Sequence, residues 1–290
     1  MNVQGALAER RLGRAIMPRF HAGFSVGTLA GALIGAGMVA LQVPVAAHLL
    51  GVAVLVGMGI PLAVRGFLPD DVERDAPEDH AERDTRGSRW KALHAWREPR
   101  TLLIGLFVLA FACAEGTGND WIGIALIDGY GTSAAVGTLG FATFLAAMTA
   151  GRWFGPRSLD RYGRVIVIRV LTVICLVGVM LFAFGTHVMG AFIGAILWGV
   201  ALALGFPVGM SAGADEPAMA APRVSVIASI GYCAFLVGPP LIGFLGDHFT
   251  VLRAFLAVAV LLAVAIMITG AIRPPIATSG SPGRQADASR

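Results

Sequence analysis

Two carboxylates and an amide stand close together within a long apolar run: Glu115, Asn119 and Asp120, in residues 101–127. An ionisable side chain inside a membrane span costs roughly 2.5–3.5 kcal/mol or more, so it is a functional candidate by default. Glu115 and Asn119 are four residues apart and share a helix face, whereas Asp120 turns to another face. These residue types could load and release a proton or hydrogen-bond a polar solute. The alternative is a pair of carboxylates that only pack, each bonded to a neighbouring helix.

Polar and aromatic side chains in other apolar runs could also contact a solute. His21 and Ser25 are four residues apart near the start of the first run, where a histidine could relay a proton or could be purely structural. Trp198, Tyr232 and Phe235 could stack on a solute, although such side chains also face lipid or pack against helices. These five residues are therefore further candidates for a solute or proton site.

A short, glycine-rich and strongly basic segment, residues 151–164, lies between two long apolar runs. Five arginines stand within residues 152–169, against a single carboxylate, Asp160. Asp160 could accept hydrogen bonds from an arginine or from a helix N-terminus, and Gly151 and Gly155 would allow close helix contact. The segment predicts either a latch between helices or a plain turn whose positive charge sets the topology.

The composition indicates a membrane protein. Of the 290 residues, 56% are hydrophobic and only 14% are charged, whereas a soluble domain carries roughly 25% charged residues. The 38 glycines fit closely packed membrane helices, where small residues let backbones approach. The net charge of +4 does not indicate a nucleic-acid partner, because the basic residues recur between apolar runs instead of gathering on one face.

The sequence also argues against enzyme chemistry. It contains no H-E-x-x-H and no paired aspartates at opposed span centres, so a membrane-embedded enzyme is the weakest function considered. Cys113, Cys175 and Cys233 each lie within an apolar run, where packing as a small hydrophobic residue is the simplest role. We therefore expect no enzyme activity, no cofactor and no metal site.

The apolar runs predict an all-α polytopic membrane protein with eight transmembrane helices, since each span needs about 20 mostly apolar residues. Within the third span, we expect Gly116 and Gly118 to interrupt the helix over residues 115–121, freeing backbone carbonyls to line a cavity. The predicted spans are residues 20–41, 45–67, 101–127, 133–154, 165–185, 188–210, 224–245 and 251–272.

The positive charges predict the orientation of these spans. If the N-terminus is cytoplasmic and the spans alternate, all of the 22 lysines and arginines except Arg253 lie on the cytoplasmic side. Lys and Arg collect on that side of membrane proteins, and a missed or extra span would scramble the pattern. We therefore expect a multi-pass inner-membrane protein with both termini in the cytoplasm.

The basic segment also resembles a family signature. Its spacing, G-R-x-x-G-x-x-x-x-D-R-x-G-R, is similar to the signature loop of the major facilitator superfamily of secondary transporters. In that family the loop lies between the second and third helices of each six-helix half and latches neighbouring helices in one access state. The resemblance therefore implies a set of gating residues: Gly151, Arg152, Gly155, Asp160, Arg161, Gly163 and Arg164.

Other segments resemble the same family. The stretch Gly238-Pro239-Pro240-Leu241-Ile242-Gly243 is similar to the Gly-Pro motif in the fifth helix of a half, which implies a helix-packing role for Gly238, Pro239, Pro240 and Gly243. The chain resembles the YbjJ-like branch of uncharacterised bacterial permeases more closely than the superfamily in general. This resemblance rests on residues 2–5, 9–10, 25–31, 114–116, 119–121, 204–207 and 223–226.

The resemblance also implies a domain organisation. A family member has six spans before its central linker and this chain has two, so we expect an N-terminally truncated member that lacks the first four helices. The implied parts are the remainder of the N-terminal half (1–67), a cytoplasmic linker with an interfacial helix near its end (68–99), a complete six-helix C-terminal half (100–273) and a disordered cytoplasmic tail (274–290).

Composition and resemblance together imply a secondary transporter of a small polar solute, such as a sugar-like metabolite. It would work by alternating access and be either facilitative or coupled to protons. Its partners would be the lipid bilayer, the solute and protons, and the complete protein would be a monomer. The alternative is an inactive membrane-embedded fragment, because transport needs both halves around a central cavity.

Overall fold

The computed structural model describes residues 17–65, 93–216 and 219–274, except for the side chains of residues 17–22, 24 and 25. The described residues form helices joined by short connections, without a β-strand. The predicted all-α fold class is therefore confirmed. The predicted tail, most of the predicted linker and the resembling segments within residues 2–10 lie outside the described residues.

The helices coincide with the predicted spans, and seven spans are long and apolar enough to cross a membrane. In α2, the helix at the first predicted span, the described apolar part is the shorter stretch Val26–Ala40. The helices are α2 (Met17–Ala40), α3 (Val45–Val64), α5 (Pro99–Ile124) with the π-helix η3 (Ala125–Gly129), α6 (Ala134–Phe154), α7 (Pro156–Tyr162), α8 (Arg164–Phe184), α9 (Val188–Leu202), α10 (Gly205–Gly213), α11 (Ala220–His248), α12 (Val251–Ala254), α13 (Leu256–Ile268) and the 3-10 helix η5 (Thr269–Ile272).

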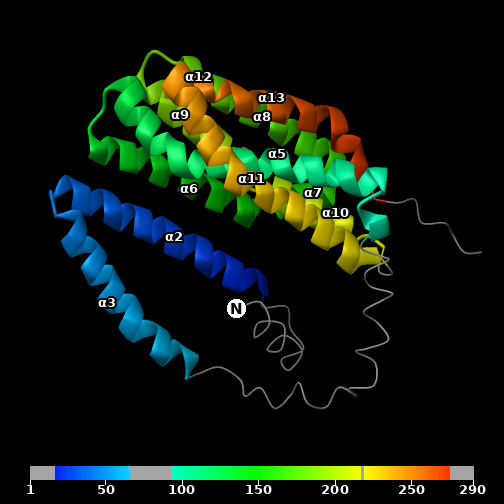
Figure 1. Cartoon of the computed structure of the whole chain (residues 1–290), viewed down its shortest axis with the longest axis horizontal. Helices are drawn as coiled ribbons and strands as arrows, with labels where there is room; N and C mark the ends of the chain where they lie inside the picture. The colour runs from blue at the N-terminus through cyan, green and yellow to red at the C-terminus, as the bar shows by residue number, and fades with distance from the viewer. Residues whose placement is uncertain (1–16, 66–92, 217–218, 275–290) are drawn as a thin grey trace, which may run out of the picture.

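Helix α5 lies at the centre of the bundle, in contact with α6, α10, α11 and α13 (Figure 1). In its most apolar stretch 72% of the residues are buried, more than in any other described span. Beside it, the rings of Phe144, Phe182, Trp198 and Phe255 meet edge to face or tilted. These four rings come from α6, α8, α9 and the α12–α13 junction, so one aromatic cluster holds four elements together.

The expected interruption of the third span is wrong. Helix α5 continues without a break through residues 115–121, and the irregular turn comes later, in η3. The glycines serve close packing instead: a Cβ on Gly116 would lie 3.2 Å from the ring of Phe235, and one on Gly118 would lie 2.5 Å from the ring of Phe144. The missing side chains admit rings from α11 and α6 and leave the α5 hydrogen bonds intact.

The predicted sixth span is divided into α9 and α10. Pro207 has no N–H to donate to the carbonyl of Ala203, so the helical hydrogen bonds of α9 cannot continue through Pro207. Gly205, the first residue of α10, packs so closely on the ring of Phe111 that a side chain would not fit. The break therefore lies where α10 turns toward α5, with which it is in contact.

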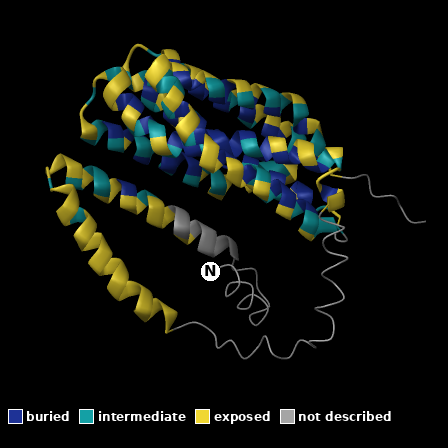
Figure 2. Ribbon diagram, viewed as in Figure 1, coloured by how far each residue is buried: buried dark blue, intermediate teal, exposed yellow. Residues whose placement is uncertain are grey.

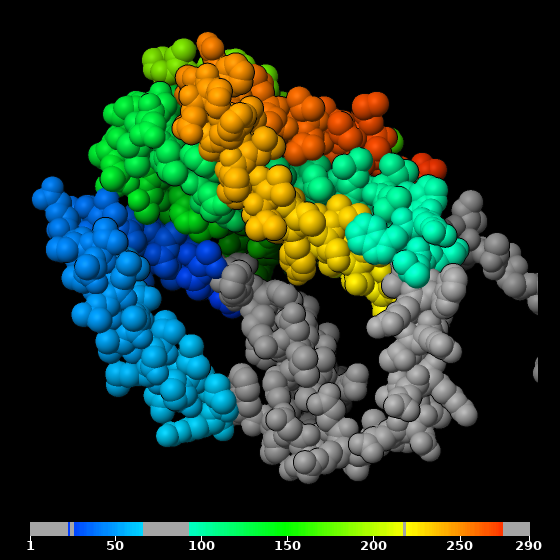
Figure 3. Space-filling model, in the orientation of Figure 1, coloured from blue at the N-terminus to red at the C-terminus, as the bar shows by residue number. Residues whose placement is uncertain are grey.

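Helices α2 and α3 differ in how they meet the bundle. Helix α2 runs along α6 (Figure 3). Ala32 of α2 is buried. Helix α3 buries none of its residues (Figure 2). Its exposed surface is almost wholly apolar, as expected of a helix whose surroundings are lipid.

The basic segment, residues 151–164, is helical over most of its length. Residues 151–154 are the last turn of α6, and residues 156–162 form the short helix α7. The chain then turns into α8 at Gly163, with φ 79° and ψ 158°. That region of backbone space is essentially open to glycine alone. Gly163 is therefore a structural requirement of the bend between α7 and α8.

We expect Gly163→Ala to lower the free energy of unfolding by about 1–3 kcal/mol, because alanine is strained in this conformation. The measurement is unfolding of the purified protein in mixed detergent micelles, followed by far-UV circular dichroism. The matched control is Gly190→Ala, where a Cβ would meet only an ordinary contact, 3.9 Å from Leu181. Equal losses in the two variants would contradict the expectation.

Candidate functional site

An ion pair joins two residues that the sequence singled out for different reasons. Arg152, in the last turn of α6, donates a 2.9 Å hydrogen bond from Nη2 to Oε1 of Glu115, which lies within the α5 span. The two side chains are 33% and 15% exposed, respectively. The guanidinium compensates the charge of a carboxylate that would otherwise be costly at this depth. A predicted solute or proton residue is thus bound directly to a predicted gating residue.

Helix α11 brings polar backbone close to this pair. The ring of Phe235 packs on Gly116, next to Glu115, and Tyr232 lies one turn earlier on α11 with its side chain exposed. Pro239 and Pro240 have no N–H, so they cannot donate to the carbonyls of Phe235 and Leu236 four residues before them. Two backbone acceptors on α11 are therefore freed near the α5 carboxylate.

The predicted helix-packing motif lies against α5. A Cβ on Gly238 would lie 3.1 Å from Sγ of Cys113, and a Cβ on Gly243 would lie 3.2 Å from the ring of Trp121. Despite the two prolines between these glycines, α11 continues to His248. The motif therefore lets α11 approach α5 closely on both sides of the prolines.

Other predicted site residues make no bond to the ion pair. Trp198 is fully buried in the aromatic cluster. Asn119 is half-buried, whereas Asp120 is exposed and makes no hydrogen bond or ion pair with any described residue. His21 and Ser25 lie on α2, and their side chains are outside the described part.

Two of the three cysteines are buried, as expected of small hydrophobic residues in the core, and one is not. Cys113 and Cys175 are buried as predicted, but Cys233 is exposed. Cys233 lies beside Tyr232 on the outer side of α11, which has no described partner helix there, so the prediction that it is a core residue is wrong.

A second cluster of charges, at the helix ends, was missed by the sequence reasoning. Asp215, just after α10, accepts hydrogen bonds from Arg100 (2.9 Å) and Arg164 (2.7 Å), which begin α5 and α8. Arg100 also donates to the carbonyls of Ala271 (3.2 Å) and Arg273 (3.0 Å), at the end of the last helix. One aspartate and two arginines thus tie four helix ends together.

Arg223 makes the densest contacts of this cluster. At the start of α11, it donates two hydrogen bonds to the carboxylate of Glu98, at 2.7 and 2.6 Å, and forms a 3.0 Å ion pair with Glu216. Thr101 donates a further 2.6 Å hydrogen bond to Glu98. We call this set the helix-end network, and its members are Glu98, Arg100, Arg164, Asp215, Glu216 and Arg223.

The electrostatics of Glu98 reflect these bonds. Burial by itself would raise the pKa of Glu98, but the hydrogen bonds from Arg223 and Thr101 favour the carboxylate and bring the pKa below its ordinary value. Glu98 therefore remains charged at neutral pH, which the two-pronged bond to Arg223 requires.

The predicted gating residues divide into two groups. Arg152 and Arg164 each bind a carboxylate, Glu115 and Asp215 respectively. Arg161 instead stacks on Tyr162, 5.2 Å from the ring centroid, and Asp160 is exposed without a hydrogen bond to any described residue. Two arginines of the segment, Arg152 and Arg164, and not its aspartate, form the described ion pairs with other elements.

Residues 5–232 match the family model described as Major Facilitator Superfamily. An uncharacterized transporter of Sinorhizobium fredii is 28% identical over 94% of this chain, and an uncharacterized MFS-type transporter of Yersinia pestis is 29% identical over 90%. The membrane protein MosC of Rhizobium meliloti is 27% identical over 91%.

The matched regions span 70%, 65% and 62% of the lengths of these three relatives, in the same order. The family match covers most of the chain, and the membrane-length helices agree with it. Together with the transporter-named relatives, they point to a multi-pass membrane transporter and not to an enzyme. The chain belongs to the Major Facilitator Superfamily.

Proposed function

We propose that this chain forms the solute-binding and gating part of a secondary transporter for a small polar solute, such as a sugar-like metabolite. The observation that carries the proposal is the 2.9 Å ion pair between Glu115 and Arg152. It links a carboxylate within a membrane span to the basic segment that connects α6 and α8. Solute or proton binding at Glu115 would therefore act directly on a helix end that can move.

The proposed mechanism uses the ion pair as a switch. A proton on Glu115, or a solute that hydrogen-bonds it, removes the charge that holds Arg152. Arg152 is already partly exposed, so it can turn to water when released. The α6–α7 bend is then held less firmly against α5, which shifts the balance between two access states.

The helix-end network supplies the second contact that must open. Arg164 holds the start of α8 to Asp215 after α10, and Arg223 holds the start of α11 to Glu98 before α5. In our proposal this end of the bundle faces the cytoplasm, because the basic residues collect there. Opening a solute path to the cytoplasm then requires these bonds to break.

The remaining assignments are part of the same proposal. Residues 1–67 belong to the N-terminal half, 68–99 to the linker, 100–273 to the C-terminal half and 274–290 to the tail, in the inner membrane with cytoplasmic termini. The solute site would lie between the halves, as in other transporters built from two repeats. Asn119, Tyr232 and Phe235 are the proposed solute contacts next to Glu115, together with the freed carbonyls of α11.

The test is uptake of small polar solutes into cells expressing the chain, with simultaneous recording of proton flux. We expect Glu115→Gln to abolish solute-driven proton flux and to flatten the pH dependence of uptake, because the amide cannot exchange a proton. Asp120→Asn, at an exposed and unpaired carboxylate on the same helix, is the matched control and should leave both unchanged. Unchanged pH dependence in Glu115→Gln would remove Glu115 from the mechanism. Absence of uptake in the parent would favour the alternative of a fragment that does not transport.

A further inference from the structure

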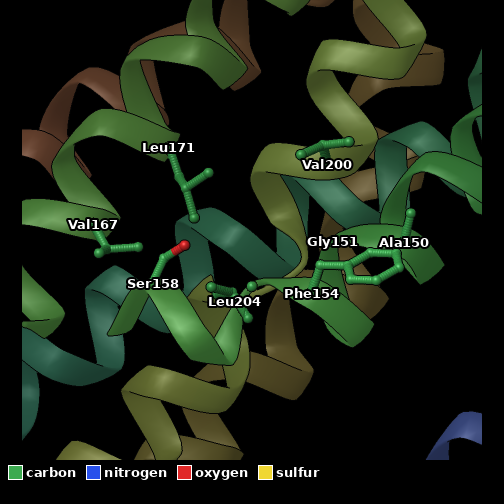
Figure 4. Close-up of a pocket in the computed structure, with 9 residues that line it drawn as sticks. Ala150, Gly151, Phe154, Ser158, Val167, Leu171, Val200 and Leu204 are labelled. Carbon is green, nitrogen blue, oxygen red and sulfur yellow. The ribbon is translucent and has the colours of Figure 1, made fainter. Parts of the chain in front are cut away.

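A groove lies where the basic segment crosses the bundle, between the α6–α7 bend and the helices α8 and α9. Its volume is about 340 Å³, within the range of small-molecule sites. Phe154, Leu171, Val200 and Leu204 surround it, and Ser158 supplies the hydroxyl among otherwise apolar lining side chains (Figure 4). An occupant must therefore be mostly apolar, with a polar group near Ser158.

The lining residue Phe154 and chain neighbours of other lining residues are exposed apolar side chains, so we place the opening of the groove toward the bilayer. Trp153 and Phe154 on α6, and Ile166 and Val170 on α8, are all more than half exposed. Apolar side chains exposed together mark contact with a membrane or a partner. Trp153 and Tyr162 also stand beside arginines, which is the arrangement of aromatic residues at the headgroup level of a bilayer.

Helix α7, which contributes Ser158 to the groove, carries positive charge that is not neutralised by an ion pair with described residues. Arg157 and Arg161 lie on α7 on either side of Ser158, and Arg161 and Ser158 share a helix face. Neither arginine forms an ion pair with any described residue, and Asp160 is the only carboxylate on α7. An anion at this helix would therefore meet two guanidinium groups.

We propose that this groove binds an anionic phospholipid of the surrounding bilayer. One acyl chain lies along the apolar lining, and the phosphate lies at the rim between Arg157 and Arg161, close to the hydroxyl of Ser158. Guanidinium groups match phosphate oxygens in geometry, and basic pockets between membrane helices are typical sites for anionic headgroups. A zwitterionic lipid offers the same chains, but its ammonium group offsets the charge of its phosphate.

The test is native mass spectrometry of the full chain in detergent, titrated with phosphatidylglycerol or with phosphatidylcholine of the same acyl chains. We expect phosphatidylglycerol to reach half-saturation at a lower concentration, with about fivefold contributed by each arginine. Arg157→Gln and Arg161→Gln should each reduce the ratio between the half-saturating concentrations of the two lipids by about fivefold. The matched control is Arg169→Gln on α8, which removes the same charge from another exposed arginine without an ion pair.

A charge-neutral variant tests the groove itself. Ser158→Leu fills the space between α7 and α8 and should weaken binding of both lipids, while the ratio between them changes little. Equal binding of the two lipids to the parent would overturn the proposal, and so would an effect of Arg169→Gln as large as that of Arg157→Gln. Lipid binding is measured here without uptake, so its failure leaves the proposed transport function standing, and the reverse also holds.

Discussion

Replacing Arg223 by methionine should lower the free energy of unfolding by about 3 kcal/mol, because removal of one partner of a buried ion pair leaves the other charge without compensation. The side chain of Arg223 is only 9% exposed, and it holds both oxygens of Glu98 as well as Glu216. Methionine keeps much of the length of the side chain but offers no donor. The measurement is unfolding in mixed detergent micelles, followed by far-UV circular dichroism.

The matched control for this variant is Arg169→Met, at an exposed arginine without an ion pair, which should change stability by less than about 0.5 kcal/mol. Acid provides a second check. Because the pKa of Glu98 is lowered in the folded state, its contribution is fully present above the ordinary value of 4.5 and is lost as the pH falls through the lowered value. The difference between parent and Arg223→Met should therefore shrink in that acidic range. Equal losses in the two variants at neutral pH would contradict our assignment of Arg223.

A chain with Arg152→Gln alone should be less stable than a chain with both Arg152→Gln and Glu115→Gln. The single change leaves a carboxylate that is 15% exposed within a membrane span without its cation, whereas the double change removes both charges. We expect a coupling free energy of about 1–3 kcal/mol from the double-mutant cycle, the upper part of the range for residues in contact. The same unfolding measurement is made on the parent, the two single variants and the double variant.

The control cycle pairs Arg152→Gln with Asp160→Asn, a carboxylate of the same basic segment that is exposed and unbonded to described residues. These two changes should add to within about 0.5 kcal/mol. If both cycles gave the same coupling, the pair between α5 and α6 would have no special role. A coupling near zero for Glu115 and Arg152 would likewise count against the proposed switch.

The spans could be predicted from the sequence because a bilayer imposes a length on apolar helices. Most observed helix ends lie within a few residues of the predicted ones, including the long α11 with its two internal prolines. The errors arose where one residue type can have two different structural effects. Gly116 and Gly118 could loosen a helix or admit a neighbour, and only the positions of Phe235 and Phe144 decide between these.

The candidate site could be predicted only in part, for a similar reason. A carboxylate in an apolar run is visible in the sequence, but its partner depends on how two helices are rotated against each other. Glu115 and Arg152 are 37 residues apart, and nothing local connects them. The helix-end network did leave a signal, because Glu98, Asp215 and Arg223 all border apolar runs. Charges at span ends on one side of the membrane are close enough to pair.

The bonds made by Arg100 bear on how this chain is synthesised. Arg100 opens α5, yet it binds backbone carbonyls 171 and 173 residues further along, at the end of the last helix. At about 5–20 residues per second, that distance takes roughly 10–35 s to translate. During this interval Asp215 is the one partner that Arg100 can gain among the bonds described above, and the contact between the start of α5 and the end of η5 is still missing. Insertion of α5 and formation of these bonds are therefore separate events in time, because the bonds cannot form before residues 271–273 have been made.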